Sequence, residues 1–131
     1  MDYKELVKMA YDAATRAYAP YSKYHVGAAL LSKSGKVYQG CNVECASYGG
    51  TNCAERTALF SAIADGEREF EAIAITTSNE EYAFPCGICR QVLIEFGPNI
   101  DVIVSQGMDY KVFKLHELLP HSWTKDELDK L

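Results

Sequence analysis

Two short motifs contain the side chains of this sequence that are best suited to chemistry. The first is Cys53-Ala54-Glu55, and the second is Pro85-Cys86-Gly87-Ile88-Cys89. Each motif follows a segment of loop composition and begins a segment with helical periodicity. Helix N-termini carry unpaired N–H groups and partial positive charge, which favour the thiolate form of cysteine. The pattern therefore predicts a cluster of thiolates at the starts of two helices.

A metal site with three cysteine ligands is the chemistry that this spacing favours. Two residues separate Cys86 from Cys89, so both sulfur atoms can bind one ion from a single helical turn. Cys53 adds a third thiolate from the facing helix. Soft thiolate ligands favour zinc over harder ions. Three protein ligands leave the fourth tetrahedral position open to water, which is typical of catalytic zinc, whereas structural zinc has four protein ligands.

Charged residues beside these cysteines have their own predicted roles. Glu55 is not needed as a ligand, so we predict that it transfers protons as a general acid and base, a role worth about 10²–10⁴ in rate. An isolated glutamate in a first helical turn would instead complement the helix dipole. Arg56 is predicted to donate hydrogen bonds to the thiolates and to offset their negative charge. Arg90 is either a second such donor or a solvated surface residue.

The surrounding periodicity predicts the elements that must position these motifs. A single α/β domain over residues 1–131 is expected, with a mixed five-stranded sheet in a three-layer α/β/α arrangement. The predicted helices cover residues 2–18, 53–64, 86–96 and 116–119, with another after Thr124. The predicted strands cover residues 25–32, 36–39, 70–77, 101–105 and 110–115.

Composition excludes several classes of partner. The 131 residues are 48% hydrophobic and 24% charged, with a formal net charge of -5. No apolar run approaches the ~20 residues that cross a bilayer, so no membrane partner is expected. The acidic balance, without any cluster of Lys and Arg, disfavours nucleic acid. Five cysteines and no recognisable export signal predict reduced thiols and a cytoplasmic location.

Taken together, the two motifs are typical of zinc deaminases, and the chain resembles the short-chain homotetrameric cytidine deaminases. The resemblance implies hydrolysis of cytidine and 2′-deoxycytidine to the uridine products and ammonia. It also implies one Zn²⁺ per chain on Cys53, Cys86 and Cys89, and proton transfer by Glu55. The segments that carry the resemblance are 18–24, 26–30, 40–44, 52–58, 85–92 and 117–120.

The same resemblance implies a set of nucleoside-binding residues. Asn42 and Glu44 match residues that bind the ribose 3′-hydroxyl, and the backbone of Ala54 matches a group that recognises the base. Tyr24 stands where the family usually has a Phe that contacts the nucleoside. Cys45 replaces a usual Asn and bears on sugar preference.

Two further aromatic residues imply an assembly. Tyr48 and Trp123 match family positions that reach into a neighbouring subunit's pocket. The resemblance therefore implies a homotetramer with shared active sites. For any single aromatic residue taken alone, ordinary core packing is the more common role.

Three alternatives compete with this interpretation. The first is a structural zinc module in which Cys41 and Cys45 join Cys86 and Cys89, leaving Cys53 unused. The second is a thiol–disulfide protein that uses Cys86 and Cys89. The third is a deaminase of a nucleoside analogue such as blasticidin S. The pair Asn42 and Glu44 favours an ordinary nucleoside over the analogue.

Overall fold

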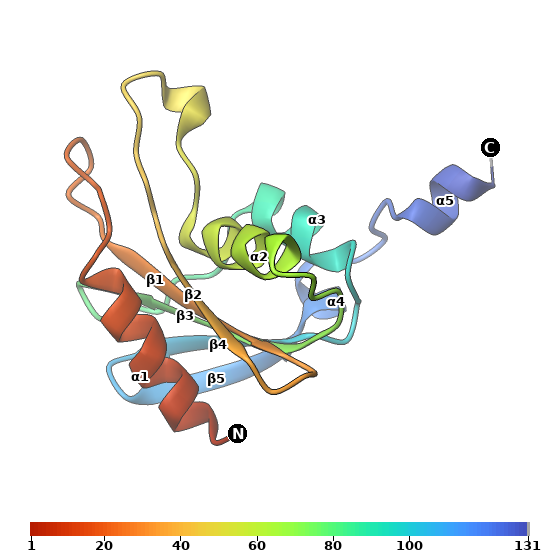
Figure 1. Cartoon of the computed structure of the whole chain (residues 1–131), viewed down its shortest axis with the longest axis horizontal. Coiled ribbons are helices and arrows are strands. Elements are labelled where there is room, and N and C mark those ends of the chain that lie inside the picture. The colour runs from red at the N-terminus through yellow and green to blue at the C-terminus, as the bar shows by residue number, and fades with distance from the viewer. Residues whose placement is uncertain (131) are drawn as a thin grey trace.

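A five-stranded mixed sheet lies between two layers of helices (Figure 1). The computed structural model describes residues 1–130. The strands are β1 (Val26–Ser32), β2 (Val37–Cys41), β3 (Phe70–Thr77), β4 (Asp101–Gln106) and β5 (Asp109–Lys114). Their order in the sheet is β2-β1-β3-β4-β5, in which only the pair β3 and β4 is parallel.

Each face of the sheet has its own apolar core. Helix α1 (Tyr3–Ala14) packs on one face through residues such as Leu6 and Ala10. Helices α2 (Ala54–Ala64) and α3 (Gly87–Ile94) cover the other face with residues such as Leu59 and Leu93. Strands β1, β3 and β4 are covered on both sides, which explains their nearly continuous apolar sequences. These observations confirm the predicted three-layer fold.

Helix α1 is shorter than its periodicity predicts. It ends at Ala14, although the apolar spacing continues to Tyr18. The backbone of Tyr18 instead pairs with the segment after β2, where its N–H donates to the Asn42 carbonyl at 3.0 Å. The Glu44 N–H in turn donates to the Tyr18 carbonyl at 2.8 Å. This pairing between distant segments overrides the local helical preference, because it satisfies backbone groups that a longer helix would use differently.

Two segments extend away from the layers (Figure 1). The first is the loop between β2 and α2, which includes a 3₁₀ turn at Tyr48–Gly50. The second follows α4 (Leu115–Leu118) and ends in α5 (Lys125–Asp129). Within residues 1–130, no helix is both long and apolar enough to cross a membrane.

Gly40 allows α2 to approach the sheet at backbone distance. A Cβ atom at this position would lie 2.4 Å from the Ala54 carbonyl oxygen and 2.4 Å from the Ala58 nitrogen. Both atoms belong to the backbone of α2, so a side chain at residue 40 would have to displace the helix. The start of α2 can therefore lie this close to β2 only because residue 40 has no side chain.

We predict that Gly40→Ala destabilises the protein by about 1–3 kcal/mol, because the added methyl group overpacks this contact. The midpoint of urea unfolding measures the effect. Gly49→Ala is the matched control, since a Cβ there meets nothing within 4 Å, and it should change stability by less than about 0.5 kcal/mol. Equal midpoints for the two variants would show that the Gly40 contact does not position α2.

Candidate active site

Two of the predicted metal ligands are N-cap residues. Cys53 immediately precedes α2 and Cys86 immediately precedes α3. Neither side chain caps its own helix by a hydrogen bond, so both sulfur atoms remain free to bind another group. Cys89 lies one turn further along α3 and is fully buried. The two helix starts face each other on the same side of the sheet, and this brings the three residues together.

The three sulfur atoms form a cluster with the dimensions of a zinc site. The Cys53 and Cys86 sulfurs are 3.8 Å apart, the Cys86 and Cys89 sulfurs are 3.5 Å apart, and all three lie within 4.8 Å of one another. Tetrahedral zinc with Zn–S bonds of about 2.3 Å requires sulfur separations of about 3.8 Å. The cluster therefore fits zinc, as predicted from the spacing.

The alternative four-cysteine site is not formed. In residues 1–130, the thiol cluster is the only group of three or more potential metal ligands whose atoms converge. Cys45 is exposed in the loop after β2, and Cys41 is only partly buried on that strand. Neither residue joins the pair Cys86 and Cys89.

Arg56 is directed at the cluster, whereas Arg90 is not. The Arg56 Nη2 atom donates a hydrogen bond to the Cys53 sulfur at 3.3 Å. Hydrogen bonds from Cys89 and Arg56 lower the pKa of Cys53 to about 5, which favours the thiolate. Arg90 donates instead to the Pro85 carbonyl at 2.8 Å and to the Leu118 carbonyl at 2.7 Å. Its role is therefore to join two backbone segments.

Glu55 lies beside the sulfur cluster in an almost closed environment. Its exposed fraction is 4%. Burial, reinforced by the negative charge of Cys53, raises the pKa of Glu55 to about 7. A carboxyl group that titrates near neutral pH can both accept and return a proton under physiological conditions. The position of Glu55 therefore suits the predicted acid–base role.

A cavity of about 230 Å³ opens onto Glu55 and two of the cysteines. Its lining includes Tyr24, Asn42 and Ala54, all three of which were predicted from sequence to bind substrate. Phe84, Ile75 and Val26 add apolar side chains to the lining, and none of them has a binding role predicted from sequence. The position of Phe84 directly before Pro85 is a signal that could have identified it. The full lining is Tyr24, Val26, Asn42, Thr51, Asn52, Cys53, Ala54, Glu55, Ile75, Ala83, Phe84 and Cys86.

Comparison with known proteins agrees with this geometry. Residues 1–106 match the family described as the cytidine and deoxycytidylate deaminase zinc-binding region. The chain belongs to this family. A cytidine deaminase from Halalkalibacterium halodurans is 46% identical over 98% of this chain and 99% of its own length. One from Sporosarcina psychrophila is 43% identical over 98% and 96%.

A solved structure shows the same fold. The crystal structure of cytidine deaminase from Burkholderia pseudomallei is 50% identical in sequence and has a TM-score of 0.89. The similarity covers 94% of this chain and 100% of that one. The deaminase family therefore accounts for the whole arrangement of sheet, helices and thiol cluster, and it excludes a thiol–disulfide protein.

In this deaminase, Asn42 and Glu44 bind the loop before β1. The Asn42 Oδ1 atom accepts a hydrogen bond from the Val26 N–H at 2.9 Å, and its Nδ2 donates to the Tyr24 carbonyl at 2.7 Å. Glu44 accepts from the N–H groups of Tyr21 and Ser22 at 3.0 and 3.1 Å. Glu44 does not line the 230 Å³ cavity but borders a second cavity of about 400 Å³, which shares Thr51 with the first.

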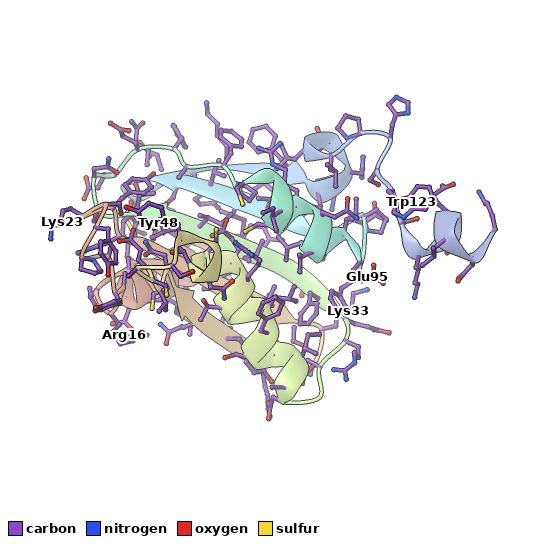
Figure 2. The ribbon with its side chains drawn as sticks, turned by 90° about the horizontal axis from the view of Figure 1, so that it is seen from above. Arg16, Lys23, Lys33, Tyr48, Glu95 and Trp123 are labelled. Atoms are coloured by element: carbon purple, nitrogen blue, oxygen red, sulfur yellow. The ribbon has the colours of Figure 1, made fainter. Side chains whose placement is uncertain are left out.

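Tyr48 and Trp123 lie far apart in the deaminase chain (Figure 2). Tyr48 is 77% exposed and borders the second cavity. Its ring packs edge-on against the ring of Tyr21, with 6.3 Å between the two ring centroids. Trp123 is 56% exposed and borders neither cavity. Its carbonyl accepts a hydrogen bond from Gln91 Nε2 at 2.6 Å. Trp123 therefore does not complete the pocket of its own chain.

We predict that Cys53→Ser loses stoichiometric zinc, because it removes one of three soft ligands and leaves two thiolates on a single helix. Cys45→Ser is the matched control and should keep one zinc per chain, since Cys45 lies outside the cluster. Elemental analysis of each purified variant measures the metal. Zinc retained by Cys53→Ser but lost by Cys45→Ser would contradict this assignment of the ligands.

Proposed function

We propose that this chain is a hydrolase that converts cytidine and 2′-deoxycytidine to uridine and 2′-deoxyuridine with release of ammonia. The observation that carries the proposal is the convergence of three thiols beside a buried Glu55 at the end of a small cavity. Membership of the deaminase family and the 46% identity to a named cytidine deaminase support the same reaction.

The chain's own residues account for binding and proton transfer. The thiolates of Cys53, Cys86 and Cys89 would hold zinc, which would supply Lewis-acid chemistry and make the attacking water easier to deprotonate. Glu55 takes a proton from the attacking water and passes it to the ring nitrogen beside the reacting carbon. Glu55 then carries the remaining proton of the added hydroxyl to the amino group, which leaves as ammonia when its bond to carbon breaks and the carbonyl of the product forms. Arg56 offsets the excess charge of the thiolates through its bond to Cys53.

The charges around the two cavities favour a neutral nucleoside over its 5′-phosphate. Among the residues that line them, only Glu44 and Glu55 carry a carboxyl group, and no Lys or Arg is present. Hydrogen bonds from the Ser22 hydroxyl and from backbone N–H groups hold the pKa of Glu44 below its usual range. A substrate phosphate would meet a carboxylate rather than a cation, and like charges repel.

The ribose contacts allow both sugars. Asn42 uses one N–H and one oxygen lone pair within the chain, so one donor and one acceptor position remain for a ligand. We assign Asn42 and Glu44 to binding of the ribose 3′-hydroxyl, as the family resemblance implies. Cytidine and 2′-deoxycytidine both carry that hydroxyl, so contacts at this position bind the two substrates equally.

We predict that zinc-loaded protein lowers the ultraviolet absorbance of cytidine and 2′-deoxycytidine solutions and turns over blasticidin S poorly or not at all. Glu55→Gln should keep one zinc per chain while losing about 10²–10⁴ in kcat, because the amide cannot carry the proton. Absence of cytidine turnover by the wild-type protein would refute the proposed reaction. Wild-type rates in Glu55→Gln would assign proton transfer to another group.

We further propose that the active protein is a homotetramer with shared sites. The 230 Å³ cavity is below the ~300–1,000 Å³ of typical ligand sites, which supports a site whose remaining walls come from a second chain. Exposed Tyr48 and Trp123 are the aromatic residues available for this purpose. A cytoplasmic location is proposed as well, since the three ligands must stay reduced to bind zinc.

A mixing experiment tests the shared sites. We predict that Trp123→Ala raises the KM for cytidine about 5- to 150-fold, as expected for loss of one aromatic contact to a base. Co-expression of Trp123→Ala with inactive Glu55→Gln should restore part of the activity, because some sites then combine an intact Glu55 with a neighbour's Trp123. Lack of restoration, or an active monomer in sedimentation, would contradict shared sites.

A further inference from the structure

Tyr24 lines the nucleoside cavity from a loop. It lies between α1 and β1, and its exposed fraction is 40%. The preceding residue, Lys23, has a positive φ of 61°, a conformation that costs energy for a residue with a side chain. Such a conformation persists only where the surroundings hold it, so the loop needs specific contacts to keep Tyr24 in place.

The hydroxyl of Ser22 supplies one of these contacts. It accepts a hydrogen bond from the Tyr24 N–H at 3.0 Å, and it donates a short hydrogen bond to the Glu44 carboxylate. A hydroxyl has one hydrogen to donate and can accept at the same time. Ser22 therefore uses both capacities to connect Tyr24 with Glu44.

The other end of the Tyr24 backbone is held from the same segment. The Tyr24 carbonyl accepts from Asn42 Nδ2 at 2.7 Å. Asn42 and Glu44 follow β2 two positions apart, and each binds one end of the loop. The connection between Tyr24 and Glu44 is made by a side chain of the loop, the Ser22 hydroxyl, whereas Asn42 binds the Tyr24 backbone directly. Removing the Ser22 hydroxyl would leave the Tyr24 N–H without this partner, while the Asn42 contact would remain.

We propose that Ser22 is a positioning residue for nucleoside binding, which sets the Tyr24 ring through the hydroxyl bridge to Glu44. This inference rests on the proposed function. Ser22 acts through Tyr24 and Glu44 rather than on the reacting atoms. Because Tyr24 contacts the nucleoside before and during reaction alike, its displacement weakens substrate binding and leaves the chemical step unchanged.

The test is the kinetics of Ser22→Ala with cytidine. We expect roughly a 5- to 20-fold increase in KM with kcat within about twofold of the wild type, the signature of lost uniform binding. Zinc content should stay at one per chain. Ser22→Thr keeps the hydroxyl and should recover most of the loss in KM. Ser22→Cys has a thiol, which is a weak hydrogen-bonding group, and should behave like Ser22→Ala.

Ser34→Ala is the matched control. The Ser34 hydroxyl also donates to a glutamate, Glu67, at 3.0 Å, but it lies in the turn at the opposite end of β1. Its removal should leave KM and kcat unchanged. An unchanged KM in both Ser22→Ala and Ser22→Cys would overturn the proposal, as would equal increases in Ser22→Ala and Ser22→Thr. Turnover by the wild type in either case would leave the proposed function intact, whereas no wild-type turnover would refute that function itself.

Discussion

The site depends on one constraint, which is that two helices must begin at the same point on one face of the sheet. Cys53 and Cys86 each occupy the position just before a helix, and their sulfurs are 3.8 Å apart. A shift of either helix by one residue would point its first thiol elsewhere. The contact of Gly40 with the backbone of α2 and the apolar packing beneath both helices therefore position the thiols as well as stabilise the fold.

The features that sequence predicts well are those with local causes. The starts of α2 and α3 are recognisable because loop residues precede each motif, and the strands carry continuous apolar runs because both their faces are covered. The apolar spacing extends α1 beyond its actual end, since a backbone pairing with a segment more than twenty positions away decides where the helix stops. Arg90 could not be assigned from sequence for the same reason, because its partner Leu118 is distant along the chain. Local spacing contains no information on such contacts.

The nucleoside pocket combines rigid and adaptable parts. Glu55, Ala54 and the cysteines stand on helix starts that the core holds in place, so the reacting end of the cavity is fixed by packing. The end that we propose for the sugar is built from the segment after β2 and the loop before β1, which hold each other by hydrogen bonds through Asn42 and Glu44. The proton-transferring and metal-binding groups thus stand on the helices, whereas the proposed sugar contacts stand on two loops. Cys45 is exposed in one of these two loops and borders the second cavity.

The two hydrogen bonds of Arg90 connect two parts of the chain that are distant in sequence. Its guanidinium side chain holds the carbonyl of Pro85, next to a metal ligand, and the carbonyl of Leu118, at the base of the segment that leads to Trp123. The position of the projecting C-terminal segment is therefore coupled through the Arg90 side chain to Pro85, beside the thiol cluster. A displacement of either backbone segment would strain the hydrogen bond that Arg90 makes to the other.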